Sequence, residues 1–117
     1  ELRGRGIVET FIEARDLTAI TVRELTTRIV HGVAEHQEEI DARVSAALDK
    51  SWTLERMPAV DRNLARIAVF EMDYTDTPGP VVIAEAVRLA QELSTDGSPG
   101  FLNGLLSKAL STKEANS

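Results

Sequence analysis

Apolar residues recur every three or four positions along most of the chain, which is the spacing of one face of an α-helix. The stretch His31 to Gln37, which contains Gly32, interrupts the longest such run, and Asp41 is a possible start for a second helix. One kinked helix and two consecutive helices therefore both remain open. A shorter run over residues 7–15 predicts another amphipathic helix. The apolar positions of the long run, over residues 21–47, are Val22, Leu25, Ile29, Val33, Ile40 and Val44, with Leu48 just beyond.

The second half of the chain predicts three further helices separated by residues that disfavour helix. The breaker cluster at residues 76–80 (DTPGP) should end a helix over residues 59–74, and Pro80 suits the first turn of the next, over residues 81–93. Ser98 is the expected N-cap of the last helix and Pro99 its first residue. Residues 111–117 (STKEANS) have no apolar side chain larger than Ala and predict a flexible tail. The expected core positions of the first and last of these helices are Val60, Leu64, Ile67, Ala68, Phe70, Phe101, Leu102, Leu105, Leu106 and Ala109.

Because no segment alternates long enough to predict a β-strand, the fold class expected is all-α. The length of 117 residues suits one compact domain. No apolar run approaches the roughly 20 residues of a membrane span, so a soluble protein without a membrane partner is expected. The chain has no cysteine, which excludes disulfides and thiolate zinc sites and fits a reducing cytoplasm. The formal net charge of −6 argues against broad, sequence-independent nucleic-acid binding, so any such contact should be local.

Residues able to support catalysis or hold a metal are few. His31 and His36 are five residues apart without an HExxH pattern, and the serines lack a GxSxG setting. No GxxxxGK[ST] loop is present for a nucleotide. These absences favour a binding module with no catalytic residue, metal or cofactor over an enzyme. Arg62 or Arg66 paired with Glu71 inside a helical bundle would be an ordinary structural role for that charged segment.

Two aromatic residues have both a structural and a binding interpretation. Trp52, the single Trp, is expected to pack between helices, with a partner contact as the alternative. Phe101 follows the segment Gly97-Ser98-Pro99-Gly100 at the predicted start of a helix, where outward backbone N–H groups can receive a phosphate. A ring beside such a helix end can stack on an unpaired base. Core packing and RNA contact both remain open for Phe101.

Three segments, in order, resemble motifs of the NusB family. Residues 52–72 (WTLERMPAVDRNLARIAVFEM) are similar to the family's Trp followed by (V/P)xxDRxxLRIAxxE. Residues 76–90 (DTPGPVVIAEAVRLA) are similar to DxPxxVxIxEAVxLA, and residues 94–106 (STDGSPGFLNGLL) to STDxSxxFxNGxL. Together they cover about half of the chain, so the resemblance is specific.

The resemblance implies a single all-α domain of two small packed helical bundles, about residues 1–50 and 51–110. It implies a transcription antitermination factor, not an enzyme, that binds the boxA RNA of ribosomal RNA leader transcripts with ribosomal protein NusE in an RNA polymerase antitermination complex. The implied RNA-binding residues are Gly97, Ser98, Gly100 and Phe101, and the implied NusE-binding residues are Glu55 and Asp61.

The N-terminal segment departs from the family pattern. The family opens with an Arg-rich helix, whereas this sequence starts at Glu1 without an initiator Met, so the first bundle is expected to be incomplete. Gly97 stands where the family often has Asp. Alternatives to the antitermination role are a NusB-like accessory domain of an RNA cytosine methyltransferase and a helical interaction protein without RNA. A homodimer is a further possibility that the family pattern leaves open.

Overall fold

The computed structural model describes residues 19–115, with side chains from residue 27 onward. This part of the chain contains only helices, which confirms the all-α fold class. The helix predicted over residues 7–15 lies outside the described residues. The elements are α2 (Ala19–Glu35), α3 (Gln37–Ala47), the 3-10 helix η1 (Leu54–Arg56), α4 (Ala59–Tyr74), α5 (Gly79–Leu93) and α6 (Ser98–Ala115).

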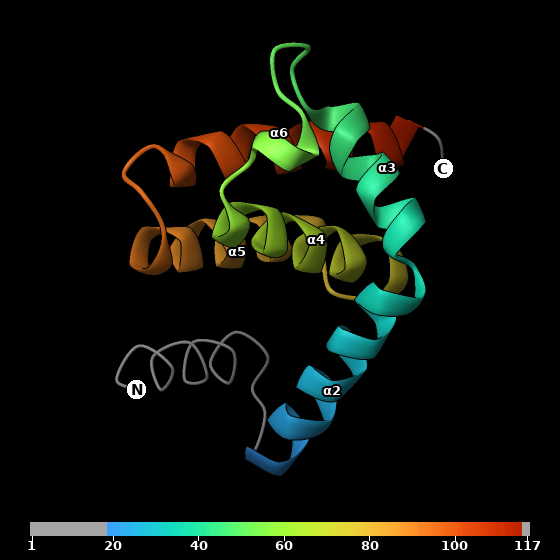
Figure 1. Ribbon diagram of the computed structural model, residues 1–117. Coiled ribbons are helices and arrows are strands. Elements are labelled where there is room, and N and C mark those ends of the chain that lie inside the picture. The colour runs from blue at the N-terminus through green and yellow to red at the C-terminus, as the bar shows by residue number, and fades with distance from the viewer. Residues whose placement is uncertain (1–18, 116–117) are drawn as a thin grey trace.

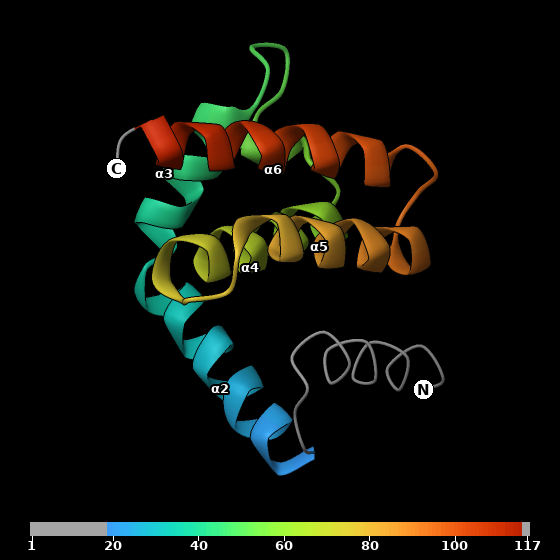
Figure 2. The same ribbon diagram turned by 180° about the vertical axis from the view of Figure 1, so that it is seen from behind.

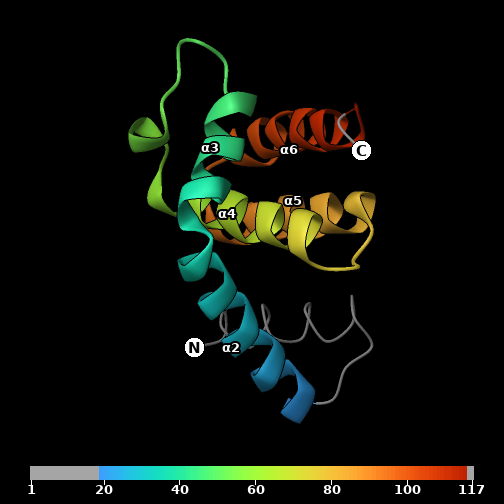
Figure 3. The same cartoon turned by 90° about the vertical axis from the view of Figure 1, so that its right-hand side faces the viewer.

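The last three helices form the body of the domain. α4 and α5 are joined by a short turn, α6 packs alongside both, and α3 packs against α4 and α6 (Figures 1 and 2). α2 meets α3 at a bend and extends away from this body, where it contacts α4 and α3 (Figures 1 and 3). No helix in residues 19–115 is long and apolar enough to cross a bilayer.

One hydrophobic core holds α3 to α6 together. The predicted positions Leu64, Ala68 and Phe70 are buried in it, whereas Val60 is 38% exposed, so its expected core position was wrong. Val60 lies in the first turn of α4, at the edge of the bundle. The largest fully enclosed side chains are Ile40, Val44, Val69, Met72, Val82, Leu102 and Leu106.

The long N-terminal apolar run forms two helices, and the break falls at His36. This break lies within the stretch of residues 31–37 that the sequence indicated, whereas α3 begins at Gln37 and not at Asp41. Gly32 lies inside α2, where a Cβ atom would come 2.2 Å from Cε1 of Phe70, so the glycine permits the close approach of α2 and α4. The His36 ring stacks on Tyr74 with 4.2 Å between ring centroids, which fixes the junction against the end of α4.

The boundaries of the later helices follow the sequence closely, with three corrections. α4 spans the predicted residues. α5 begins at Gly79, two residues before the range predicted for it, with Pro80 in its first turn. α6 begins at Ser98, one residue before the predicted start. The tail predicted to be flexible from residue 111 is helical as far as Ala115, and two of its polar side chains donate to backbone oxygens. Thr112 Oγ1 donates to the Lys108 carbonyl at 3.0 Å, and Lys113 Nζ donates to the carbonyl of Met72 in α4.

Two bidentate ion pairs join α3 to α4. Arg66 donates through Nε and Nη2 to Asp41 at 2.8 and 3.1 Å, and Arg43 contacts Asp73 in the same way at 2.8 and 3.0 Å. Arg66, which the sequence suggested as a partner for Glu71, therefore lies against a different helix. Paired forks of this kind fix the orientation of two helices as well as their separation.

Candidate RNA-binding site

The turn between α5 and α6 presents two of the predicted RNA-binding residues to solvent. Gly97 and Gly100 are exposed, and a Cβ atom on either would meet nothing within 4 Å. A ligand could therefore approach the backbone of this first turn of α6 closely. Ser98, in contrast, is 3% exposed, so its expected place on the RNA surface was wrong for the side chain. The turn lies at the opposite end of α5 from the α4–α5 connection (Figure 1).

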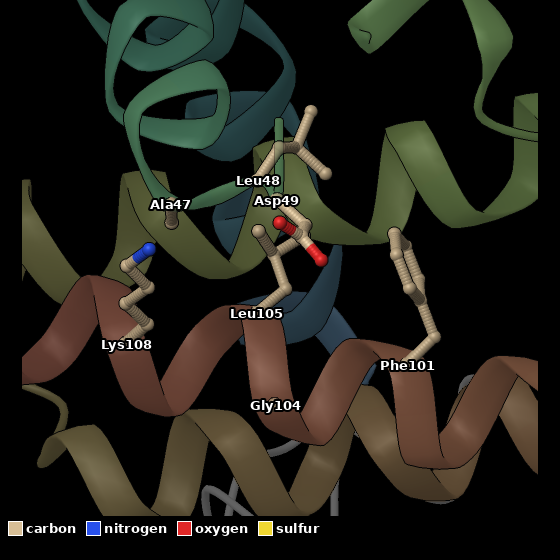
Figure 4. A pocket seen from close by; sticks show the side chains of 7 residues that line it. All are labelled: Ala47, Leu48, Asp49, Phe101, Gly104, Leu105 and Lys108. Carbon is tan, nitrogen blue, oxygen red and sulfur yellow. The ribbon is translucent and has the colours of Figure 1, made fainter. Parts of the chain in front are cut away.

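Phe101 combines the two roles that the sequence left open. Its ring is half-buried and packs against the core, yet it also lines an open pocket of about 240 Å³ between α6 and the end of α3. Figure 4 shows the Phe101 ring and the Lys108 side chain projecting from α6 toward the Ala47–Asp49 segment. The pocket therefore places an aromatic ring and an amine on the same face of α6. Its lining residues are Ala47, Leu48, Asp49, Phe101, Gly104, Leu105 and Lys108.

Trp52 lies on the surface beside Phe101, and the expectation of core packing was wrong. Its side chain is 40% exposed, and its ring lies 5.5 Å from that of Phe101, centroid to centroid, at an angle of 51°. The guanidinium of Arg56 lies 5.6 Å from the Trp52 centroid, and Arg56 Nη1 donates to the Ser51 carbonyl at 3.0 Å. Arg56, Trp52 and Phe101 thus form a continuous cation–aromatic array, of which the sequence interpretation missed Arg56. The signal for Trp52 was its place in a loop, outside any amphipathic helix.

Asp61 does not lie on the surface, so its expected exposure to a partner was wrong. It is 3% exposed, and its carboxylate accepts hydrogen bonds from Ser94 Oγ at 2.5 Å and Ser98 Oγ at 2.8 Å. Thr95 Oγ1 lies 3.0 Å from Ser98 Oγ. The carboxylate therefore links the start of α4 to both ends of the α5–α6 turn.

Glu55 is exposed in η1 and lines a groove of about 580 Å³ next to Trp52. Glu38 of α3 is also exposed there, whereas the carboxylate of Asp41 in the same groove is occupied by Arg66. Two free-standing carboxylates and an aromatic edge suit a basic side chain better than an anion. The groove is thus chemically distinct from the pocket beside Phe101. Among the residues described, no group of three or more potential metal-binding side chains is present.

These features define a class of protein, a small helical domain that offers a cation–aromatic face with an exposed glycine turn on one side of Trp52 and an acidic groove on the other. Comparison with known proteins gives the family. The family model described as "NusB family" matches residues 7–111. The chain belongs to the NusB family.

Curated and solved relatives agree with this assignment. The chain is 52% identical over 85 residues to the transcription antitermination protein NusB of Cutibacterium acnes, which covers 73% of this chain and 33% of that protein. It therefore spans about a third of the length of that relative. T. maritima NusB superposes with a TM-score of 0.76 at 26% identity, over 97% of this chain and 96% of that one. A chain from the crystal structure of antitermination factors NusB and NusE in complex with dsRNA superposes with a TM-score of 0.71 at 25% identity, over 86% and 74%.

Proposed function

We propose that this chain is the RNA- and partner-binding domain of a transcription antitermination factor, which binds boxA RNA of ribosomal leader transcripts together with ribosomal protein NusE. The observation that carries the proposal is the Arg56–Trp52–Phe101 array beside the exposed α5–α6 turn. The name of the Cutibacterium acnes relative and the complex of antitermination factors among the structural relatives support it. The role is one of binding, without a reaction, within a cytoplasmic RNA polymerase antitermination complex.

The RNA side of the proposal rests on stacking and local positive charge. Aromatic rings at a surface hold unpaired bases with about 1–3 kcal/mol per base. Phe101 and Trp52 offer the rings, while Arg56 and Lys108 supply cations for adjacent phosphates. The exposed backbone at Gly97 and Gly100 lets the strand approach closely. A net charge of −6 makes this a local site, in which the RNA touches only a small basic face.

The partner side of the proposal rests on the acidic groove. Glu55 and Glu38 face solvent there, and charged faces of opposite sign speed and orient association. A basic segment of NusE would fit these carboxylates. Because Trp52 and Leu48 border both the groove and the Phe101 side, a bound partner would lie next to the RNA. The two ligands could then contact each other as well as the protein.

The test is a binding titration with labelled boxA RNA at fixed salt, with and without NusE. Phe101→Asp removes the stacking ring and adds a negative charge, so its Kd should rise roughly 5- to 150-fold, corresponding to about 1–3 kcal/mol. Val81→Asp is the matched control, because Val81 is an exposed apolar residue at the far end of α5. Equal RNA affinity of the Phe101 variant, the control and the unmodified protein would refute the proposed RNA site.

The single Trp offers an independent readout of the same event. Trp52 lies against Phe101 and borders the proposed RNA face, so its fluorescence should change when a base stacks nearby. The Kd fitted to the fluorescence titration should equal the Kd measured with the labelled RNA. An unchanged emission spectrum at saturating RNA would place the strand elsewhere on the molecule.

A further inference from the structure

Asp61 makes hydrogen bonds that its position in α4 does not require. It is the third residue of α4, where an acidic side chain ordinarily reaches back to cap its own helix. Pro58, at the N-cap, has no side-chain capping bond. Asp61 instead contacts hydroxyls 33 and 37 residues away in the sequence, in Ser94 and Ser98. Its carboxylate therefore serves the turn between α5 and α6.

The direction of each hydrogen bond follows from the number of available protons. A carboxylate accepts only, and each hydroxyl has a single proton to donate. Ser94 therefore donates to Oδ1 and Ser98 to Oδ2, at 2.5 and 2.8 Å. With the Ser98 proton committed, Thr95 Oγ1 is the donor in its 3.0 Å contact with Ser98 Oγ. Both carboxylate oxygens and both serine protons are thus used within this network. The 2.9 Å contact between Ser94 Oγ and Ser98 Oγ then has no proton of its own, because both serines donate to Asp61.

We propose that Asp61 is a positioning residue that holds the α5–α6 turn in the conformation that binds RNA. This inference rests on the function proposed above. Asp61 itself is enclosed and does not reach the RNA. It acts through Ser94, the C-cap of α5, and through Ser98, the first residue of α6.

The geometry of α6 explains how the effect reaches the binding face. Phe101 lies one turn beyond Ser98, and its N–H donates to the Gly97 carbonyl at 3.1 Å. The rotation of this first turn therefore sets the direction of the Phe101 ring and of the exposed glycine backbone. Between the two clamped serines, residues 95–97 are exposed and have little other packing to hold them. A turn that is ordered before binding avoids the entropy cost of ordering it in the complex.

Hydrogen exchange tests the positioning role without any RNA. Asp61→Asn keeps the size of the side chain but replaces one acceptor oxygen with a donor group that opposes a serine proton. The amides of Ser98 and Phe101, which donate to the Thr95 and Gly97 carbonyls, should exchange about tenfold faster, whereas amides in the middle of α4 and α5 should not. Asp76→Asn is the control, because Asp76 is an exposed acid in the loop at the other end of α4. If turn amides of the Asp61 and Asp76 variants exchange at the same rate, the inference falls.

A double-mutant cycle links the network to RNA binding. Asp61→Asn and Ser98→Ala should each raise the Kd for boxA RNA about tenfold, and the double variant should lose no more than either single one. Affinity for NusE alone should stay unchanged. Independent, multiplying losses would overturn the inference. A loss of NusE affinity in the Asp61 variant but not in the Ser98 variant would also overturn it, because Asp61 would then contact the partner itself.

The hydrogen-exchange experiment and the RNA-binding experiment together distinguish a failure of this inference from a failure of the proposed function. If the unmodified protein binds no boxA RNA, the proposed function fails, while the exchange rates still decide whether Asp61 orders the turn. If RNA binds but turn exchange is unaffected by Asp61→Asn, the positioning role alone fails. Should Asp61→Asn lose its helical circular dichroism, Ser98→Ala carries the same exchange comparison, since it removes one of the two hydroxyls that the carboxylate binds.

Discussion

Replacement of Gly104 by Ala should stabilise the fold and weaken RNA binding at the same time. Gly104 lies inside α6 and lines the pocket beside Phe101. A Cβ atom there would meet nothing within 4 Å, so the folded protein has room for the methyl group. A glycine inside a helix costs about 1 kcal/mol relative to alanine. No internal contact explains this cost, whereas close approach of a ligand to the helix backbone would.

The expected sizes of the two effects follow from these observations. Gly104→Ala should raise the free energy of unfolding by about 0.5–1 kcal/mol. For a domain of this size, that gain raises Tm by roughly 2–5 °C. A methyl group forced into a filled interface costs about 1 kcal/mol or more, so the Kd for RNA should rise about fivefold or more. Stability and affinity should therefore change in opposite directions.

Thermal unfolding by circular dichroism and an RNA titration at fixed salt measure the two effects on the same preparation. Ser111→Ala is the control, because Ser111 is exposed on α6 two turns beyond Gly104 and away from the pocket. It should gain some helix stability and bind RNA as the unmodified protein does. A fall in Tm for Gly104→Ala would contradict the packing argument. A higher Tm with unchanged RNA affinity would show that the strand does not reach this face of α6.

Three further changes test other parts of the structure. Gly32→Ala should lower the free energy of unfolding by about 1–2 kcal/mol, because its methyl group would overlap the buried Phe70 ring. The cost of this overlap should exceed the gain from the higher helix propensity of alanine, so a raised Tm would contradict the prediction. Glu55→Lys should weaken NusE binding at low salt and leave Tm nearly unchanged, and calorimetry that finds the same Kd would remove Glu55 from the interface. Partial desolvation, and after it the carboxylates of Glu39 and Asp73, raise the pKa of Tyr74, although the residue is 42% exposed. The folded state therefore holds this proton more tightly, and that stability is lost as pH rises through the folded pKa. Tyr74 is the only tyrosine, so an absorbance titration reports it alone, and a midpoint at the value of free tyrosine would exclude the shift.

The limits of the helices were predictable where local signals bracket an apolar stripe. Pro58 and the DTPGP cluster enclose the stripe of α4, and its observed bounds match the prediction. The break between α2 and α3 was not predictable in the same way, because the role of Gly32 depends on Phe70, a residue from another helix. From the sequence alone, a glycine that ends a helix cannot be distinguished from one that lets an aromatic ring of another helix pack closely.

In the candidate site, too, positions set by neighbouring residues could be predicted from the sequence, whereas positions set by tertiary contacts could not. Phe101 could be proposed as an RNA-binding residue from the sequence, because a ring directly behind a glycine-rich turn is visible there. Asp61 was misplaced because nothing local distinguishes an exposed acid from one enclosed by two hydroxyls more than thirty residues away. Trp52 was misplaced for the opposite reason: a lone tryptophan usually packs inside, but this one lies in a loop where Phe101 and Arg56 cover only part of its ring.

Trp52 and Leu48 give the proposed RNA and partner sites a common border, and this has a thermodynamic consequence. Leu48 lines both the Phe101 pocket and the acidic groove, and Trp52 lines the groove while it packs against Phe101. A partner that orders these two side chains from the groove lowers the entropy cost of ordering them for RNA. Linkage then requires reciprocity: if NusE tightens RNA binding by some factor, RNA must tighten NusE binding by the same factor. In the proposed complex, the basic partner would cover the carboxylates of the groove, so that an acidic domain could hold an anionic strand beside it.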